Sequence, residues 1–374
     1  MNIAFVYDRV NKIGGAERVL AELHAMWPHA PLYTAVYDPA TAPWAKNFQV
    51  KTTFLQNIPF ARRHHEWFAW LTPMAFSVLP FDQYDVVLTI TSAEAKGIIT
   101  KPHTLHICYC LTPTRYLWSG VDMYMKETGF GVFHALVQYV YKKMLPMLKS
   151  WDFIAAQRPD IYIAISQRVK KRIETYYKKT VSDVIYPPVD TDFFVPSQEH
   201  KEIGEYYLVV SRLVPYKRVD LLVQVCTKMK RNLIVLGTGP DIKRLKKLAG
   251  PTIQFIDKNL TDNTLAGYYR NCRAFLYAGD EDFGIVAGEA QSCGKPVIAY
   301  AKSGVSEIVK DHVTGVLFAS QTESDLEQAI QQFERMKISS QKCRQNAMRF
   351  DKRLFHSRIR RFVKDAYQKY STTL

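Results

Sequence analysis

The chain alternates between short, nearly continuous apolar runs and longer segments whose apolar residues have helical spacing. In the first half, the apolar runs lie at residues 2–8, 31–37, 50–54, 85–91, 104–110 and 160–165. Such runs are typical of strands buried on both faces of a parallel sheet. Helical patterns occupy residues 18–26, 131–149 and 167–178. This order of segments predicts a doubly wound α/β domain.

The same alternation starts again at residue 206, after a break at residues 184–192, VIYPPVDTD. Further strand candidates are YYLVVSRL, NLIVLGTGP, TIQFID, AFLYAGDE, KPVIAY and TGVLFA, with helices expected from residues 219, 241 and 263. Consecutive prolines exclude a helix and stiffen the backbone, as suits a hinge. We therefore predict an acceptor-binding domain, 1–186, and a donor-binding domain, 187–350. A last helix over 351–370 is expected to cross back, so that 351–374 joins the first domain.

The stretch 279–293, GDEDFGIVAGEAQSC, combines two carboxylates with a helix start. Gly284 lies where a strand gives way to a helix, and the free N–H groups of a helix N-terminus favour an anion. Glu281 and Glu289 are eight positions apart, about 2.2 helical turns, so Glu281 precedes the helix and Glu289 lies inside it. Two carboxylates around an anion-binding turn match a nucleotide sugar, which carries hydroxyls on both sides of a diphosphate.

Two cations follow the strand candidate at 206–210, in the loop SRLVPYK. Arg212 and Lys217 are suited to a diphosphate leaving group, whose negative charge grows in the transition state. Either residue alone would be interpreted as a solvated cation, but their combination with Glu281 and Glu289 favours a ligand. The Asp-x-Asp triplets at 190–192 and 280–282 do not follow the turn expected of a metal-dependent nucleotide-sugar fold, and no His or Cys has zinc spacing. We expect no metal.

The first half offers weaker candidates. Gly14 and Gly15 follow the first strand and allow the backbone to approach a ligand closely. Arg115 and its neighbours follow the strand at 104–110, where open α/β sheets place ligand contacts. Residues 57–79 interleave basic residues with Trp67, Phe68 and Trp70. This segment is interpreted either as a helix on an anionic membrane or acceptor groove, or as core aromatics with a solvated basic face.

Charge and composition narrow the possible partners. The 374 residues include 50 Lys and Arg against 35 Asp and Glu, a net charge of +15. Such a charge attracts nucleic acid, anionic lipid or phosphorylated ligands, and no nucleic-acid-binding module is recognisable. No apolar run of transmembrane length and no signal peptide is found, so a cytoplasmic, peripheral location is expected. The six scattered cysteines are expected to be reduced and packed as apolar groups.

Taken together, several motifs resemble the retaining family 4 glycosyltransferases. They are GGAE, SRLVPYKRVD, IYPPVDTDFF, EDFGIVAGEAQSCGKPVIAYAKSGVSEIV and TGVLF. The segments YDVVLTITSAEAKGI and ICYCLTPTRYLW are similar to bacterial mannosyltransferases that extend lipid-linked surface polysaccharide and O-antigen. The resemblance implies the GT-B fold, two doubly wound domains facing across a cleft. It also implies a nucleotide-sugar donor, GDP-mannose first and a UDP-sugar second, no cofactor, and a glycan or lipid-linked acceptor at the membrane.

The resemblance also implies roles for individual residues. Glu281 would hold hydroxyls of the donor sugar, and Glu289 those of the ribose. Arg212 and Lys217 would grip the diphosphate, and with Glu281 they form the implied catalytic set. Further donor contacts would come from Phe283, Gly284, Ile285, Val286, Gly14 and Gly15. The resemblance also implies that the acceptor hydroxyl attacks from the front face and that the departing phosphate takes its proton.

Three departures from the family pattern concern other contacts. Leu111 stands where relatives have a histidine facing the donor sugar, in YCLTP, which also contains Thr112. Ala164-Ile165-Ser166 replaces Ala-Asn-Ser, and Ser303-Gly304 replaces Gly-Gly. Leu111, Thr112 and Arg115 are therefore interpreted as acceptor-side residues.

The alternatives to a glycosyltransferase are a nucleotide-sugar epimerase or phosphorylase of the same fold, a donor-binding protein without activity, or a basic protein that binds nucleic acid or membrane without catalysis.

Overall fold

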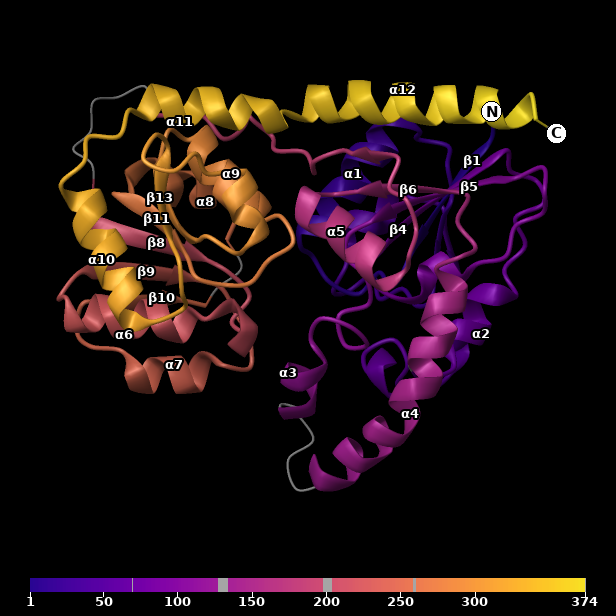
Figure 1. Ribbon diagram of the computed structural model, residues 1–374, viewed down its shortest axis with the longest axis horizontal. Helices are drawn as coiled ribbons and strands as arrows, with labels where there is room; N and C mark the ends of the chain where they lie inside the picture. Colours follow the sequence, from indigo (N-terminus) through magenta and orange to yellow (C-terminus); the bar gives the residue numbers. More distant parts are fainter. Residues whose placement is uncertain (69, 127–133, 198–203, 258–259, 374) are drawn as a thin grey trace. The chain divides into compact units, whose positions relative to one another are not determined.

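The computed structural model describes residues 1–68, 70–126, 134–197, 204–257 and 260–373. The chain divides into two compact units. The first consists of Met1–Tyr186 with His356–Leu374, and the second is Pro187–Phe355. In each unit a parallel sheet is covered by helices on both faces (Figure 1). The fold prediction of two doubly wound α/β domains is confirmed.

The sheet of the first unit has the order β3-β2-β1-β4-β5-β6-β7, with all pairs parallel. Its strands are β1 (Ile3–Tyr7), β2 (Leu32–Thr34), β3 (Val50–Thr52), β4 (Val86–Thr91), β5 (Leu105–Cys110), β6 (Ile161–Ala164) and β7 (Asp183–Val184). All residues of β1, β4 and β5 are buried, which explains why they form unbroken apolar runs. The order reverses between β1 and β4, and open α/β sheets bind ligands outside the carboxyl ends of strands at such a switch point.

The helices of the first unit include short turns that the sequence pattern did not resolve. They are α1 (Gly15–Met26), α2 (Thr72–Ser77), α3 (Val121–Lys126), α4 (His134–Ala155) and α5 (Gln167–Tyr176), with 3-10 turns η1 (Pro43–Asn47), η2 (Phe54–Asn57), η3 (His65–Phe68) and η4 (Glu94–Gly97). The prediction of one helix within residues 57–79 is wrong, because η3 and α2 are separate there. Buried Ala75 and Phe76 of α2 pack into a core with Val6 and Val87 of the sheet.

Helix α4 also differs from its prediction. The start of the predicted range, residues 131–133, lies outside the described residues, and the helix continues to Ala155 instead of ending at residue 149. Its last turns bury Asp152 and Ala155 against the rest of the unit. In Figure 1, α4 runs away from the sheet with α2 beside it.

The sheet of the second unit has the order β10-β9-β8-β11-β12-β13, again all parallel. Its strands are β8 (Tyr206–Val210), β9 (Asn232–Leu236), β10 (Ile253–Ile256), β11 (Ala274–Tyr277), β12 (Val297–Tyr300) and β13 (Gly315–Phe318). The helices and turns are η6 (Pro215–Lys217), α6 (Val219–Lys228), α7 (Ile242–Leu248), α8 (Asp262–Asn271), α9 (Ile285–Ser292), η7 (Gly304–Glu307), α10 (Glu323–Glu334), α11 (Ser340–Ala347) and η8 (Met348–Phe350). The switch point of this sheet lies between β8 and β11.

Helix α12 (Lys352–Ser371) begins in the second unit and continues through the first. At its start, Lys352 pairs with Asp190 at 2.8 Å and Arg353 pairs with Asp192 at 2.7 Å. Both carboxylates of the first Asp-x-Asp triplet therefore have cationic partners. Further along, the Arg358 guanidinium bonds both carboxylate oxygens of Asp183, at 2.9 and 3.0 Å.

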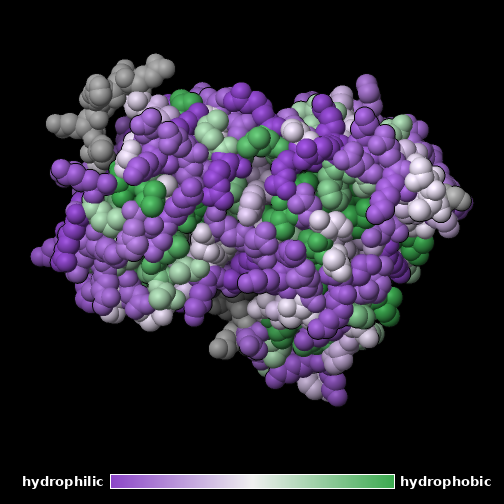
Figure 2. Space-filling model, turned by 45° about the horizontal axis from the view of Figure 1, so that its top comes forward, coloured by the Kyte–Doolittle hydropathy of each residue, from purple (hydrophilic) through white to green (hydrophobic). Residues whose placement is uncertain are grey.

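The mostly hydrophilic surface and the buried cysteines are typical of a globular protein. Hydrophilic side chains cover most of the face shown in Figure 2, and hydrophobic residues form separate clusters on it. All six cysteines are free thiols and buried, as predicted. Among the described helices, none combines the length and the apolar character needed to cross a bilayer.

Candidate active site

The loops after β8 and β11 meet at the switch point of the second sheet. The first loop runs through Arg212 to Lys217, and the second contains Gly279 and Glu281. A Cβ at Gly279 would lie 3.0 Å from the Cα of Lys217, so glycine permits the close approach of the two loops. This contact brings the Lys217 ammonium into an ion pair with the Glu281 carboxylate. Lys217 Nζ also lies 3.2 Å from the Tyr277 hydroxyl oxygen.

The Lys217–Glu281 pair is largely shielded from water, because the two side chains are 15% and 18% exposed. Burial alone disfavours the ammonium, but the negative charge of Glu281 and the Tyr277 hydroxyl together raise the pKa of Lys217. Burial, followed by the charge of Glu281, raises the pKa of Tyr277. At neutral pH the site therefore contains a cation and a carboxylate beside a protonated phenol.

The backbone around Glu281 is held by the loop that follows β12. The Glu281 N–H donates to Ser303 Oγ at 3.2 Å, and the Gly304 N–H donates to the Glu281 carbonyl at 2.7 Å. Ser303 is one of the departures from the family pattern, and it replaces a glycine with a side chain that bonds the site. The carboxylate is therefore presented by a loop that is fixed on two sides.

Helix α9 starts directly after this loop, with Gly284 as its N-cap. Gly284 has φ +92°, and a Cβ there would lie 2.5 Å from Val305 Cγ2, so both backbone and space favour glycine. The first N–H groups of a helix have no partner within the helix, which makes those of Ile285 and Val286 candidates for an anion. The Phe283 side chain is buried against Phe350, so only its backbone could contact a ligand.

Glu289 lies inside α9, as the spacing predicts, and its side chain is 1% exposed. Tyr269 of α8 donates a hydrogen bond of 2.9 Å to Glu289 Oε2. A buried carboxylate that accepts such a hydrogen bond has a fixed orientation.

Arg212 is not part of this cluster. Its side chain is exposed, and within the described residues it has no side-chain hydrogen bond or ion pair. The structure thus brings together Lys217 and Glu281 but leaves Arg212 in solvent near the end of β8.

The glycine turn of the first unit carries a carboxylate that the sequence interpretation missed. Gly14 is the extended N-cap of α1, and Gly15 is the first residue of the helix, which therefore starts earlier than predicted. Glu17 in the first turn accepts a hydrogen bond of 2.6 Å from Tyr7. A Cβ at Gly14 would lie 3.0 Å from Glu17 Oε2. This negative charge opposes a phosphate at the turn.

The loop after β5 contains the predicted acceptor-side residues. The Leu111 N–H donates to the Thr91 carbonyl at 2.8 Å. Thr112 is 6% exposed, and its hydroxyl has no hydrogen-bond partner among the described residues. Arg115 is half-buried, and its carbonyl accepts a hydrogen bond of 2.8 Å from the Gly120 N–H.

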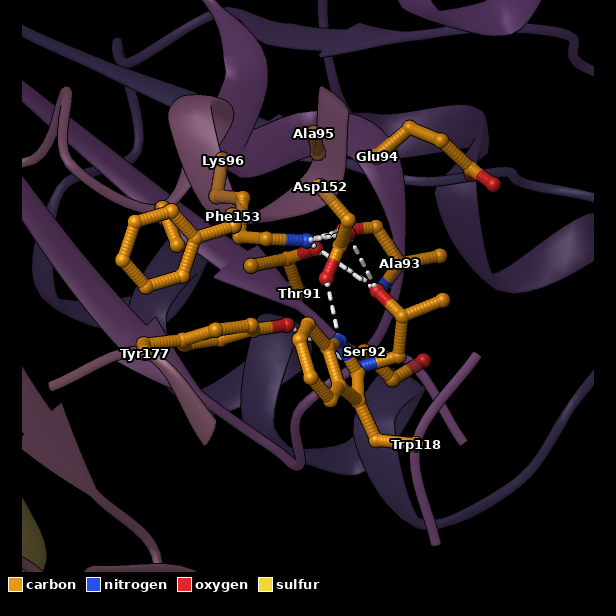
Figure 3. Close-up of polar contacts among 12 residues, drawn as sticks. Thr91, Ser92, Ala93, Glu94, Ala95, Lys96, Trp118, Asp152, Phe153 and Tyr177 are labelled. Atoms are coloured by element: carbon orange, nitrogen blue, oxygen red, sulfur yellow. Dashed lines mark hydrogen bonds and ion pairs between the residues drawn. The ribbon is translucent and has the colours of Figure 1, made fainter. Parts of the chain in front are cut away.

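A buried ion pair that the sequence did not reveal anchors this loop (Figure 3). Lys96 Nζ lies 2.5 Å from Asp152 Oδ1, and both side chains are almost fully buried. The Asp152 carboxylate also accepts from Thr114 Oγ1 at 2.8 Å and from Trp118 Nε1 at 2.7 Å. Lys96 and Asp152 therefore join η4, α4 and the loop after β5. Lys96 is the fifth residue after buried strand β4, and a lysine in the loop that follows such a strand was the signal that could have identified it.

No group of three or more His, Cys, Asp and Glu side chains in the described parts of the chain is arranged to hold a metal ion. The Asp282 side chain is buried, and Asp190 and Asp192 are paired with cations as described above.

Comparisons with known proteins show what the second unit resembles. Residues 190–350, which make up most of the second unit, match the model of the glycosyl transferases group 1 family. Relatives include an uncharacterized glycosyltransferase of Methanocaldococcus jannaschii, 25% identical over 58% of this chain and 62% of its own. Another is the GDP-mannose-dependent alpha-(1-6)-phosphatidylinositol monomannoside mannosyltransferase of Mycobacterium tuberculosis, 31% identical over 46% of this chain and 52% of its own. The chain thus spans less than two thirds of these relatives.

Solved structures match over nearly the whole chain and show the fold. The lipopolysaccharide outer core galactosyltransferase WaaB matches with a TM-score of 0.67 at 18% identity, over 98% of this chain and 100% of its own. HepE of Anabaena in complex with UDP and glucose matches with a TM-score of 0.69 at 16% identity, over the same shares. The GT-B fold that the motifs implied is therefore confirmed.

Proposed function

We propose that the protein is a retaining, metal-independent glycosyltransferase that moves a hexose from a nucleotide sugar to a glycan or lipid-linked acceptor in surface polysaccharide synthesis. The observation that carries the proposal is the shielded Lys217–Glu281 pair beside the N-terminus of α9, at the switch point of the second sheet. The family match of residues 190–350 covers Glu281 and α9.

The donor would be held almost entirely by the second unit. Lys217 and Arg212 bind the diphosphate, Glu281 the sugar hydroxyls and Glu289 the ribose hydroxyls. The backbone N–H groups of Phe283, Gly284, Ile285 and Val286 complete the anion site. Gly14 and Gly15 contribute the weakest donor contact in this proposal, because the charge of Glu17 opposes phosphate there.

The reaction breaks the bond between C1 of the sugar and the diphosphate oxygen, and the acceptor hydroxyl oxygen forms the new bond to C1 from the same face. The acceptor proton passes to the departing phosphate. Lys217 and Arg212 stabilise the charge that develops on the diphosphate. One such contact typically contributes about 3 kcal/mol, or roughly a hundredfold in rate.

GDP-mannose is the preferred donor in this proposal, supported by the mycobacterial relative that is named as dependent on it. A UDP-sugar comes second, supported by the UDP bound to HepE. Leu111, Thr112 and Arg115 are proposed to face the acceptor. The net charge of +15 supports a peripheral position at the anionic cytoplasmic face of a membrane, each basic residue near the surface contributing about 1 kcal/mol.

The test is incubation with a panel of GDP- and UDP-sugars, with and without EDTA, and with glycans and short-chain lipid-diphosphate glycans as acceptors. We expect release of one nucleotide diphosphate that depends on the acceptor, persists in EDTA and gives a product with the donor's anomeric configuration by NMR. Release of a free 2-epimer without an acceptor would instead establish an epimerase. No release from any donor, together with nucleic-acid binding that weakens steeply with salt, would establish the non-catalytic alternative.

A further inference from the structure

Exposed hydrophobic side chains are concentrated on the first unit. Among the described residues, every exposed large hydrophobic side chain belongs to this unit except Val313 and Leu354. Most of them lie in two segments, residues 58–78 and helix α4. Exposed apolar side chains gathered in a few segments are candidates for an interaction site.

Helix α4 carries one exposed apolar stripe, which consists of Leu136, Val140, Met147 and Ile154. Successive members are four, seven and seven residues apart, so they lie on one face of the helix, and they are 45% to 61% exposed. The buried Asp152 lies on a different face, in the network with Lys96. The α4 stripe is thus turned away from the contacts that hold the helix to its unit.

Segment 58–78 divides its apolar residues between the core and the surface. Phe68 and Leu71 pack against the core, whereas Trp67, Trp70, Met74 and Val78 are 51% to 62% exposed. The Phe60 side chain is 72% exposed. Its backbone has φ +65°, a left-handed conformation that costs a bulky residue free energy. An aromatic side chain held in solvent on a strained backbone indicates a function beyond folding.

The two segments approach each other at η4, which contacts α2 and the last turns of α4, and both segments carry cations. Helices α2 and α4 both pack against η4, and they lie side by side in Figure 1. Arg62, Arg63, Lys142 and Lys143 are exposed. A hollow of about 510 Å³ is lined by Gln56, Asn57, Ile58, Pro59, Phe60, Arg62 and Arg63. Guanidinium groups next to an exposed phenyl ring suit an anionic head group attached to an apolar chain.

We infer that segment 58–78 and the α4 stripe form one surface that docks the protein on a bilayer of anionic lipids. Tryptophan and lysine beside aliphatic side chains are the residues that insert at the boundary between head groups and acyl chains. A second copy of the chain fits less well, because its own Arg62, Arg63, Lys142 and Lys143 would face like charges. This surface would be the membrane contact of the proposed function, and its binding to vesicles can be measured without any glycosyl transfer.

The test is sedimentation of the full-length protein with vesicles of phosphatidylcholine alone or mixed with phosphatidylglycerol, at low and high salt. Binding should require the anionic lipid and weaken with salt. Lys142→Ala with Lys143→Ala should lower the partition coefficient about thirtyfold, from about fivefold for each cation removed. Trp67→Ser with Trp70→Ser should lower it by at least about tenfold at both salt concentrations, since this contribution is apolar.

Matched variants in the second unit serve as controls. Lys243→Ala with Lys247→Ala removes two exposed cations of α7, and Val313→Ser with Leu354→Ser removes the two exposed apolar residues of that unit. Both should bind vesicles like the wild type. Equal losses from the α7 and α4 pairs would show attraction by net charge alone and overturn the inference. A wild-type dimer in sedimentation equilibrium that only the α4 or tryptophan variants dissociate would also overturn it, by showing a second copy as the occupant. Nucleotide-induced thermal shifts should be unchanged in all four variants, which separates this result from the proposed donor site.

Discussion

Replacing Lys217 with methionine tests the proposed site, because it removes the ammonium while keeping most of the side-chain volume. Breaking a fully buried ion pair costs about 3–5 kcal/mol. The remaining solvent contact of Lys217 and Glu281 reduces the expected loss of unfolding free energy to about 1–3 kcal/mol. The loss of one cation opposite the leaving group should lower kcat/KM by at least about a hundredfold in addition.

The assay combines urea unfolding with kcat/KM for nucleotide release, measured per folded molecule. Arg231→Met is the matched control, because Arg231 forms a bidentate pair with Glu334 at 2.7 and 2.8 Å in the same unit. Arg231 directly precedes β9, so it lies at the amino ends of the strands, away from the loops that carry the site. The control should lose some stability and keep its turnover. Turnover of Lys217→Met within threefold of the wild type, or an equal loss in the control, would refute the role of Lys217.

Three further predictions concern the supports of the two units. Gly284→Ala should cost about 1–3 kcal/mol by urea unfolding and weaken nucleotide binding, because φ is +92° and Cβ would meet Val305; unchanged binding would contradict the anion site. Burial, reinforced by nearby cations, lowers the pKa of His106 to about 3, so the unfolded chain takes up a proton below about pH 6.5 while the folded protein stays neutral. Stability should therefore fall by up to about 1.4 kcal/mol per pH unit between about pH 6 and 4, and His106→Gln should flatten that slope; an equal slope in both proteins would be evidence against it. Asp152→Asn leaves the buried Lys96 without its counter-charge and should cost about 3–5 kcal/mol of stability without changing nucleotide affinity, whereas a stable variant with weaker nucleotide binding would contradict this assignment.

The fold and half of the candidate site could be predicted because they follow from local patterns. Buried parallel strands give unbroken apolar runs, and residues that follow such strands gather at one edge of the sheet. That rule alone places Lys217 and Glu281 in neighbouring loops. The helix start at Gly284 was also predictable from a local pattern. A glycine between a strand and a helical pattern is typical of a left-handed N-cap, which is the conformation of Gly284.

The remaining features depend on packing that no local pattern contains. Glu17 lies beside Gly14 only because α1 turns its first acidic residue toward Tyr7. Lys96 and Asp152 are 56 residues apart and meet because α4 packs on η4. Residues 57–79 were wrongly predicted as one helix, because a mixed aromatic and basic composition does not reveal that the chain turns at Phe60 with positive φ.

The most direct measurement of the central claim is calorimetric titration of GDP and UDP into the wild-type protein and into Lys217→Met and Glu289→Gln. We expect one of the two nucleotides to bind the wild type without a metal. Both substitutions should lower its affinity by at least about tenfold, and Arg231→Met should leave the affinity unchanged. Absence of binding by either nucleotide to the folded wild-type protein, or equal affinity in all variants, would contradict a donor site between the loops of β8 and β11.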